Sequence, residues 1–543
     1  TTDVDHDERV AGSRTTYDDD GGTTAAVAYS NFDGLGHFRQ ATDSGNFPGG
    51  NIHTAVTDYN PGNGTYPGGF VLPAVNGPWL LGTFDWQTVT DWASTSKVES
   101  CFDATTGFLY RKRILQSGAA EGPNDVLRVY SGVDGRGNVT AEDDFGGDTQ
   151  NLNAICSNAC GCALGTGQYH VDNTYLYGSL VTSRYGGAPF YSTFGTIDRN
   201  TGLVASSQDT SGLLTTYSYD VLGRLTSKAP PDALATSYAY TPANGMSPAT
   251  VDITTTGGVT HSTILFDDLG RLWREARLDP AGWNNRETLY DGAGNKLSVS
   301  EWGSFASKTQ YLGYDPFGRP QTIRPPDGAA HDLTLVYHGV RQVDRRVAVA
   351  GPAGEQLQTT TEIYDRQGRL VQVQEPAGGT VTNYGYDVGN RLAQVASSGS
   401  GTTQVRNFAY DNRGFLKSEQ HPEKGPSGNG FVTHSGYDPR GHAGQTIDGP
   451  NNLLFSYDFA ERLTAVRDGN NGSRTLKAFS YSSANGSGTG YSLGKLLQSS
   501  RYNYILADGA PTTVEIRQSY AYGDGSAPYG TGRATNRTTR FFI

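Results

Sequence analysis

The chain has 543 residues, a formal net charge of -12 and only 18% charged residues. An acidic balance without clustered Lys and Arg argues against nucleic acid as a partner, and no run approaches the roughly 18 apolar residues of a membrane span. Glycine (72) and tyrosine (32) are abundant, and no long stretch shows apolar residues at helical spacing. The composition therefore predicts an all-β protein of short strands joined by tight turns.

The N-terminal region, residues 1–205, shows a weak aspartate–turn–glycine pattern. It occurs at long, irregular intervals, in "FDGLGHF", "FDATTGFL", "VDGRGNV" and "IDRNTGLV". Asp before and Gly after a short turn are typical of β-hairpins. We interpret this region as a divergent β region. Its opening, without Met or an apolar leader, indicates a processed chain or a piece of a larger one.

Two stretches of this region have alternative interpretations. The acidic opening from Asp3 has Glu8 where an EF-hand loop needs glycine, so a solvated acidic terminus is favoured over a calcium site. Trp79, Trp86 and Trp92 lie within "NGPWLLGTFDWQTVTDW". Packing in a sheet core is the favoured interpretation, and a platform on which sugar rings stack is the alternative.

The four cysteines are Cys101, Cys156, Cys160 and Cys162, the last three within "CSNACGC". In an exported protein they favour disulfides, with three possible connectivities. Free thiols are a second possibility. A zinc site is the third, although this spacing is not usual for a zinc knuckle.

The middle region, residues 206–466, repeats one motif: tyrosine or phenylalanine, aspartate, two variable residues and glycine. The interval between aspartates is 20 to 27 residues or about twice that, and degenerate copies at Tyr240 and Tyr337 fill the double intervals. Such a period indicates a repeat architecture. The turn residues that we assign are Asp220, Gly223, Asp267, Gly270, Asp291, Gly294, Asp315, Gly318, Asp365, Gly368, Asp411, Gly414, Asp438 and Gly441.

Each repeat is interpreted as one β-hairpin. The aspartate suits the first position of a type I turn, where its carboxylate accepts a backbone N–H, and the glycine suits the left-handed position that follows. Alternating aromatics before the turn, as in Tyr217 and Tyr219, share one face of a strand. The arginine that often follows the glycine, as Arg224 does, is expected to cover aromatic faces or to pair with carboxylates. Successive hairpins should pair into one long sheet.

These residues resemble the RHS/YD-repeat family, which includes bacterial Rhs polymorphic toxins, the C components of insecticidal toxin complexes, wall-associated YD proteins and teneurins. The pattern Y/F-D-x-x-G-[RNH]-L is clearest from Tyr219 to Leu463 and detectable from Phe32. The resemblance implies a long β-sheet that spirals into a hollow shell, which in toxin members encloses a C-terminal effector.

The chain also departs from the toxin members of that family. Their shell is closed by a segment with an Asp-Pro-[Ile/Leu]-Gly-Leu stretch, near which self-cleavage releases the effector. Here Asp-Pro occurs at Asp279, Asp315 and Asp438 without that stretch. The resemblance therefore assigns this chain neither self-cleavage nor a toxin cargo.

Residues 467–543 are interpreted as degenerate repeats of a chain that is incomplete or truncated. The motifs of common hydrolases, metalloproteases and nucleotide-binding proteins are missing, so we expect a non-enzymatic protein without cofactor or metal. The first functional hypothesis is a secreted or cell-surface shell segment that encapsulates or presents a partner polypeptide. A surface adhesion or carbohydrate-binding protein is the second, and a fibre assembled through the strand edge at Phe541–Ile543 is the third.

Overall fold

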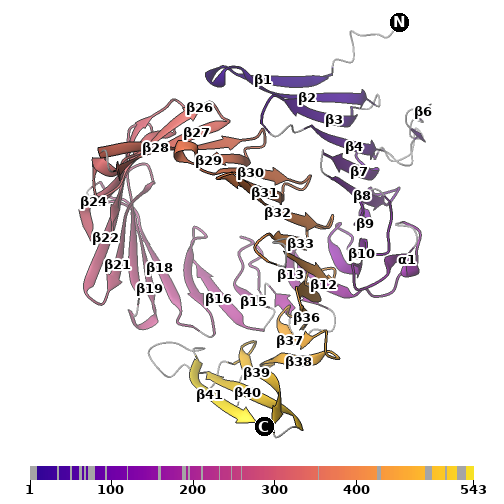
Figure 1. Ribbon diagram of the computed structural model, residues 1–543. Helices are drawn as coiled ribbons and strands as arrows, with labels where there is room; N and C mark the ends of the chain where they lie inside the picture. Colours follow the sequence, from indigo (N-terminus) through magenta and orange to yellow (C-terminus); the bar gives the residue numbers. More distant parts are fainter. Residues whose placement is uncertain are drawn as a thin grey trace. The chain divides into compact units, whose positions relative to one another are not determined.

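The regular secondary structure of the computed structural model consists almost entirely of antiparallel strands (Figure 1). The structure describes residues 9–32, 36–48, 52–59, 64–65, 69–70, 80–91, 94–118, 120–156, 160–185, 191–193, 196–209, 212–231, 233–245, 247–258, 260–351, 354–424, 430–483, 492–507, 510–522 and 534–542. The prediction of an all-β array of hairpins is confirmed. Among the helices in these ranges, none is long and apolar enough to cross a membrane.

The strands cluster into two units. Unit 1 comprises Thr1–His170, Val336–Arg346 and Leu357–Leu453, and unit 2 comprises Val171–Leu335, Val347–Gln356 and Leu454–Ile543. The division into residues 1–205, 206–466 and 467–543 stays a prediction.

Unit 1 contains an N-terminal run of strands and a later run of repeat hairpins. The N-terminal run is β1 (Gly12–Tyr17), β2 (Thr23–Phe32), β3 (Phe38–Gly45), β4 (His53–Tyr59), β5 (Gly64–Thr65), β6 (Gly69–Phe70), β7 (Phe84–Thr90), β8 (Thr95–Phe102), β9 (Leu109–Ile114), β10 (Val126–Val133), β11 (Val139–Gly146) and the helix α1 (Leu152–Ile155). The later run is β29 (Leu370–Gln374), β30 (Val381–Tyr386), β31 (Leu392–Gly399), β32 (Thr402–Tyr410), β33 (Leu416–His421), β34 (Gly430–Ser435) and β35 (Gln445–Asp448).

Unit 2 is built of further hairpins. Its strands are β13 (Ser179–Tyr185), β14 (Tyr191–Thr193), β15 (Ser206–Gln208), β16 (Leu214–Tyr219), β17 (Leu225–Ala229), β18 (Thr236–Thr241), β19 (Thr250–Thr255), β20 (His261–Phe266), β21 (Leu272–Asp279), β22 (Gly282–Tyr290), β23 (Lys296–Glu301), β24 (Ser304–Tyr314), β25 (Pro320–Arg324), β37 (Leu463–Asp468), β38 (Arg474–Tyr481), β39 (Leu496–Ala507), β40 (Ala510–Tyr522) and β41 (Ala534–Phe542). The boundaries between the units fall within or beside β12 (Tyr169–Leu176), β26 (Leu333–His338), β27 (Gln342–Gly351), β28 (Gly354–Tyr364) and β36 (Asn451–Tyr457).

Most strands pair with their neighbours along the chain, although β4 pairs with β7 and β5 pairs with β6 in a separate sheet. From β16 to β25 every consecutive pair is antiparallel, and the same holds from β28 to β35. The register shifts at the aromatic residue before a repeat turn, for example between Ser218 and Tyr219. This bulge follows from the extra residue that the aspartate–glycine turn inserts. Because each repeat contributes two antiparallel strands, all repeat turns of one run lie at the same end of the strands.

A compact apolar cluster lies beside α1 in unit 1. Leu127, Val129, Phe145, Leu152 and Cys156 are buried there. Elsewhere Trp86 lies half-buried in β7, with the Lys97 ammonium 5.7 Å from its ring centroid. Trp79 and Trp92 lie outside the described residues, as do Asp3 and Glu8 of the acidic opening.

Candidate functional site

Each repeat turn is organised by its aspartate. In the repeat at Tyr219, the Oδ1 of Asp220 accepts the backbone N–H groups of Leu222 and Arg224, both at 2.9 Å. The Oδ2 accepts the Arg224 Nε–H at 2.7 Å. The Arg224 backbone N–H is the largest cause that holds the pKa of Asp220 below its ordinary value, and the guanidinium adds to it against the opposing effect of burial.

The same turn recurs at every assigned position. The aspartates at 267, 291, 315, 365, 411 and 438 accept the equivalent backbone N–H groups. The φ values are 77° at Gly223, 75° at Gly270, 92° at Gly294, 73° at Gly318, 76° at Gly368, 102° at Gly414 and 96° at Gly441. Two variants put another residue in this left-handed position, Asn390 at 61° and Glu461 at 64°.

The arginine after the turn couples one repeat to the next. Arg224 lies over the ring of Tyr240 at 4.4 Å from its centroid, and the Tyr240 hydroxyl donates to the Leu225 carbonyl at 2.9 Å. The ring is thus held by a cation–π contact and a hydrogen bond from the preceding hairpin. The same stack joins Arg271 to Tyr290, Arg369 to Tyr386, Arg391 to Tyr410 and Arg462 to Tyr481.

Other residues take the arginine's place in some repeats. Phe415 stacks on Tyr437, with ring centroids 5.1 Å apart. Asn295 donates to Asp291 at 3.0 Å, and His442 lies 2.8 Å from the Asp438 carboxylate. This position after the turn is thus normally filled by a side chain that meets the turn aspartate or the next ring.

In unit 1 the turn tips of four successive repeats rest on the N-terminal run, and we call this contact the seam. Arg366 forms an ion pair with Asp43 of β3 at 2.9 Å, and the Val388 N–H donates to the Ser94 Oγ at 3.1 Å. Val388 is 9% exposed. The first two tips are therefore closed against β3 and the β7–β8 turn.

The last two tips of the seam are packed more closely. Arg413 is buried between Asp411 and Asp148, and Arg440 lies 4.8 Å from the ring centroid of Tyr169. The Tyr169 hydroxyl donates to Asp438 at 2.6 Å.

A glycine lets the backbones of the seam approach. A Cβ on Gly147 would lie 2.9 Å from the Tyr437 carbonyl oxygen, and the φ of Gly147 is 77°. The next residue, Asp148, donates its N–H to that same carbonyl at 3.0 Å. A side chain at position 147 would therefore separate the two runs.

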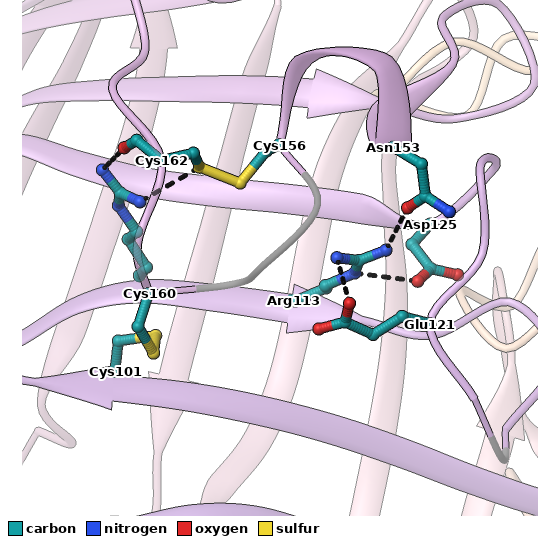
Figure 2. Close-up of a disulfide and its surroundings, with 9 residues drawn as sticks. Cys101, Arg113, Glu121, Asp125, Asn153, Cys156, Cys160 and Cys162 are labelled. Carbon is teal, nitrogen blue, oxygen red and sulfur yellow. Dashed lines mark hydrogen bonds and ion pairs between the residues drawn. A yellow bond between two sulfur atoms is a disulfide. The ribbon is translucent and has the colours of Figure 1, made fainter.

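Two disulfides and a buried ion pair fix the loops beside the seam (Figure 2). Cys101 of β8 is bonded to Cys160, and Cys156, which follows α1, is bonded to Cys162. Arg111 of β9 donates to the Cys162 carbonyl at 2.7 Å. The structure thus places all four cysteines in disulfides, and no group of metal-ligating residues is found among the residues that it describes.

Arg113 of β9 lies fully buried beside them. Its Nε donates to Asp125 at 2.8 Å, and further N–H groups donate to Asn153 at 2.9 Å and to the Gly122 carbonyl at 3.1 Å. The Glu121 carboxylate lies 3.1 Å away. Asp125 is also fully buried. The charge of Arg113 is thereby compensated by two carboxylates, as a buried charge requires.

Unit 2 contains a pocket of about 600 Å³ at one repeat turn. It lies between the β18–β19 loop and the turn after β20. Its lining includes Phe266, Asp267, Asp268, Trp273 and Ser247.

A family comparison decides the nature of the repeats. The RHS Repeat model matches residues 200–235 and 364–403, and both matched segments contain turns described above. The chain carries RHS repeats. No curated protein matches the sequence.

Two solved structures are similar to this RHS-repeat chain. One is the crystal structure of TcdB2-TccC3 without its hypervariable C-terminal region, at 12% identity and a TM-score of 0.46, covering 96% of this chain and 26% of that one. The other is a porin-like protein from Bacteroides uniformis, at 15% identity and a TM-score of 0.15, covering 43% of this chain and 87% of that one. The chain thus spans about a quarter of the first structure's length.

The sequence pattern located the RHS turns but not what they contact. The seam partners Asp43, Ser94, Asp148 and Tyr169 were not assigned, and neither was Arg113 or the pocket. Arg113 lies in the alternating stretch "FLYRKRIL", where it looks like any other strand arginine. Only the repeated arginine after the turn gave a sequence signal for a contact.

Proposed function

We propose that this RHS-repeat chain is a non-enzymatic wall segment that encloses or presents a partner polypeptide. The observation that carries the proposal is the seam, because it joins the turns of one run of hairpins to the N-terminal run of the same unit. A sheet whose turns are covered by another run of the same chain is suited to building a continuous wall. The coupling of each arginine to the next tyrosine stiffens that wall along its length.

Exposed apolar turn tips in unit 2 support a polypeptide partner. Val221 is fully exposed, and Leu222, Leu269 and Phe317 are 73%, 75% and 75% exposed. These residues occupy the positions that unit 1 covers in its seam. Exposed apolar turn residues in a row at one end of the strands are typical of a surface that another chain covers.

The disulfides support an exported protein. Two disulfides within one chain persist in oxidising compartments and are rare in the cytosol. We therefore place the protein outside the cell or at its surface.

Small-angle X-ray scattering of the purified chain tests the wall. A hollow body gives a pair-distance distribution whose maximum is shifted to long distances, whereas a rod gives an early maximum and a long tail. The variant Gly147→Val is expected to open the seam and to raise both the radius of gyration and the protease sensitivity of residues 365–441. Gly202→Val, at a positive φ of 71° with nothing within 4 Å of its Cβ, is the control for backbone strain alone. A rod-like profile of the unmodified chain would reject the wall.

A carbohydrate-binding surface is the second candidate. Trp283 is 48% exposed, and its ring meets His261 edge-on at 4.7 Å. Exposed aromatic rings beside polar groups are suited to stacking on sugars. Glycan-array binding that is lost in Trp283→Ala supports this candidate, and an array without signal rejects it. The fibre hypothesis stays a prediction.

A further inference from the structure

The pocket of unit 2 lies where the coupling between two repeats is missing. Most repeats with an arginine after the turn place it over the aromatic ring of the next repeat, at 4.4 Å for Tyr240 and 4.5 Å for Tyr290. The ring between these two is Phe266, at the end of β20. The repeat before it begins at Tyr240, where the sequence "YTPANGMSPAT" replaces the aspartate–glycine–arginine turn.

That degenerate turn takes a different path. Asn244 donates its N–H to the Ser247 carbonyl at 3.1 Å, and its own Oδ1 accepts the Ser247 N–H at 3.0 Å. Ser247 and Pro248 then line the pocket together with Phe266. Among the residues that the structure describes, none places a cation over the Phe266 ring. Phenylalanine also lacks the hydroxyl that would donate to the preceding hairpin.

The charged side chains around the pocket differ in whether they form ion pairs. Asp267 is engaged by Arg271 at 2.7 Å. Arg274, whose guanidinium lies 4.5 Å from the ring centroid of Trp273, is paired with Glu287 at 2.9 Å. Asp268 is exposed, and within the described part of the chain no ion pair holds it. The pocket thus combines the aromatic side chains of Phe266 and Trp273 with the carboxylate of Asp268, which no cation of the described residues engages.

We propose that this pocket binds the guanidinium group of an arginine supplied by a partner polypeptide. The arginine would lie over Phe266, as Arg224 lies over Tyr240. It would pair with Asp268, which also lines the pocket, because the position equivalent to Asp220 in this degenerate repeat is Thr241 and carries no carboxylate. A cation over a ring combined with a charge-assisted hydrogen bond is the contact that this chain makes repeatedly within itself. The net charge of -12 favours a basic partner. The inference does not depend on whether the wall encloses its partner.

Titration of the whole chain with capped tripeptides tests the proposal. The probes are acetyl-Gly-Arg-Gly-amide and its citrulline counterpart, which keeps the shape without the charge. Binding is followed by calorimetry and by tryptophan fluorescence at low salt. The arginine peptide is expected to bind with a stoichiometry of one peptide per chain and at least fivefold more tightly than the citrulline peptide.

Two variants locate the binding. Asp268→Asn and Phe266→Leu, which keeps an apolar side chain but removes the ring, are each expected to weaken it at least fivefold, with unchanged circular dichroism. The matched control Asp209→Asn, at an exposed turn of the same unit, is expected to bind as the unmodified chain does.

A variant that should create a second site tests the same contact through a gain of binding, which loss of folding cannot produce. Arg462→Ala uncovers the Tyr481 ring and releases Asp458, so it should add a second equivalent of arginine peptide. Equal binding of both peptides, no binding to either, or binding that is unchanged in both Asp268→Asn and Phe266→Leu would overturn the proposal. A monosaccharide that binds through Trp273 while the arginine peptide does not would assign the pocket to glycans instead.

Discussion

Replacing the buried Arg113 by methionine should destabilise the disulfide-linked part of unit 1. Both Arg113 and Asp125 are 0% exposed, and breaking a buried ion pair by removing one partner costs about 3–5 kcal/mol. Asp125 would keep the N–H groups of Gln116 and Gly122, each at 2.8 Å, so we expect the lower half of that range. The methionine keeps an apolar stem of similar length.

Hydrogen exchange followed by mass spectrometry measures this cost locally, which matters because a chain of two units need not unfold in one step. Amides of residues 109–156 should exchange about 140- to 700-fold faster in Arg113→Met, since about 1.4 kcal/mol corresponds to a factor of ten. Adding Asp125→Asn should restore part of the protection, because the uncompensated charge is then removed. Arg136→Met, at an exposed turn, is the control.

An exchange rate within threefold of the unmodified chain in Arg113→Met would refute the reasoning. It would mean that the ion pair is replaced by water at little cost and is not a closed, dry site.

Four further outcomes are expected. Serine at both Cys101 and Cys160 should lower stability by about 4 kcal/mol, because the bond closes a loop of 59 residues; denaturation with and without reductant checks this. Glu461→Gly should stabilise its hairpin by about 0.5–1 kcal/mol, since Glu461 has a φ of 64°, and slower local exchange would show it. Tyr386→Phe should cost about 0.5–1.5 kcal/mol by removing its 2.8 Å hydroxyl bond to the preceding repeat; no change in exchange there would contradict the coupling. Burial raises the pKa of Asp344, but its hydrogen-bond donors outweigh this and lower it to about 2, so the stability it contributes is present above about pH 4 and lost as the pH falls towards 2; Asp344→Asn should flatten that loss in an acid titration.

The repeat hairpin could be predicted because all of its determinants are local. Asp220 and Gly223 are three residues apart, and the turn that they form needs no partner elsewhere in the chain. The seam could not be predicted, because Asp43 and Arg366 meet across more than three hundred residues without any shared period.

The pocket shows a third case, intermediate between these two. The degenerate turn after Tyr240 was visible in the sequence. Its consequence, an uncovered Phe266, became visible only when the structure showed where Arg224 and Arg271 point.

The pairing of consecutive strands has a consequence for how such a chain can change in length. Because a repeat contributes two strands, gaining or losing a whole repeat leaves every other turn at the same end of the strands as before. Gaining or losing a single strand would move all later turns to the opposite end of the strands, away from partners such as Asp43 and Asp148. Duplication of whole hairpins is therefore the change in length that this architecture tolerates. The number of repeats can then vary while the repeat turns stay at one end of the strands and the connecting loops at the other.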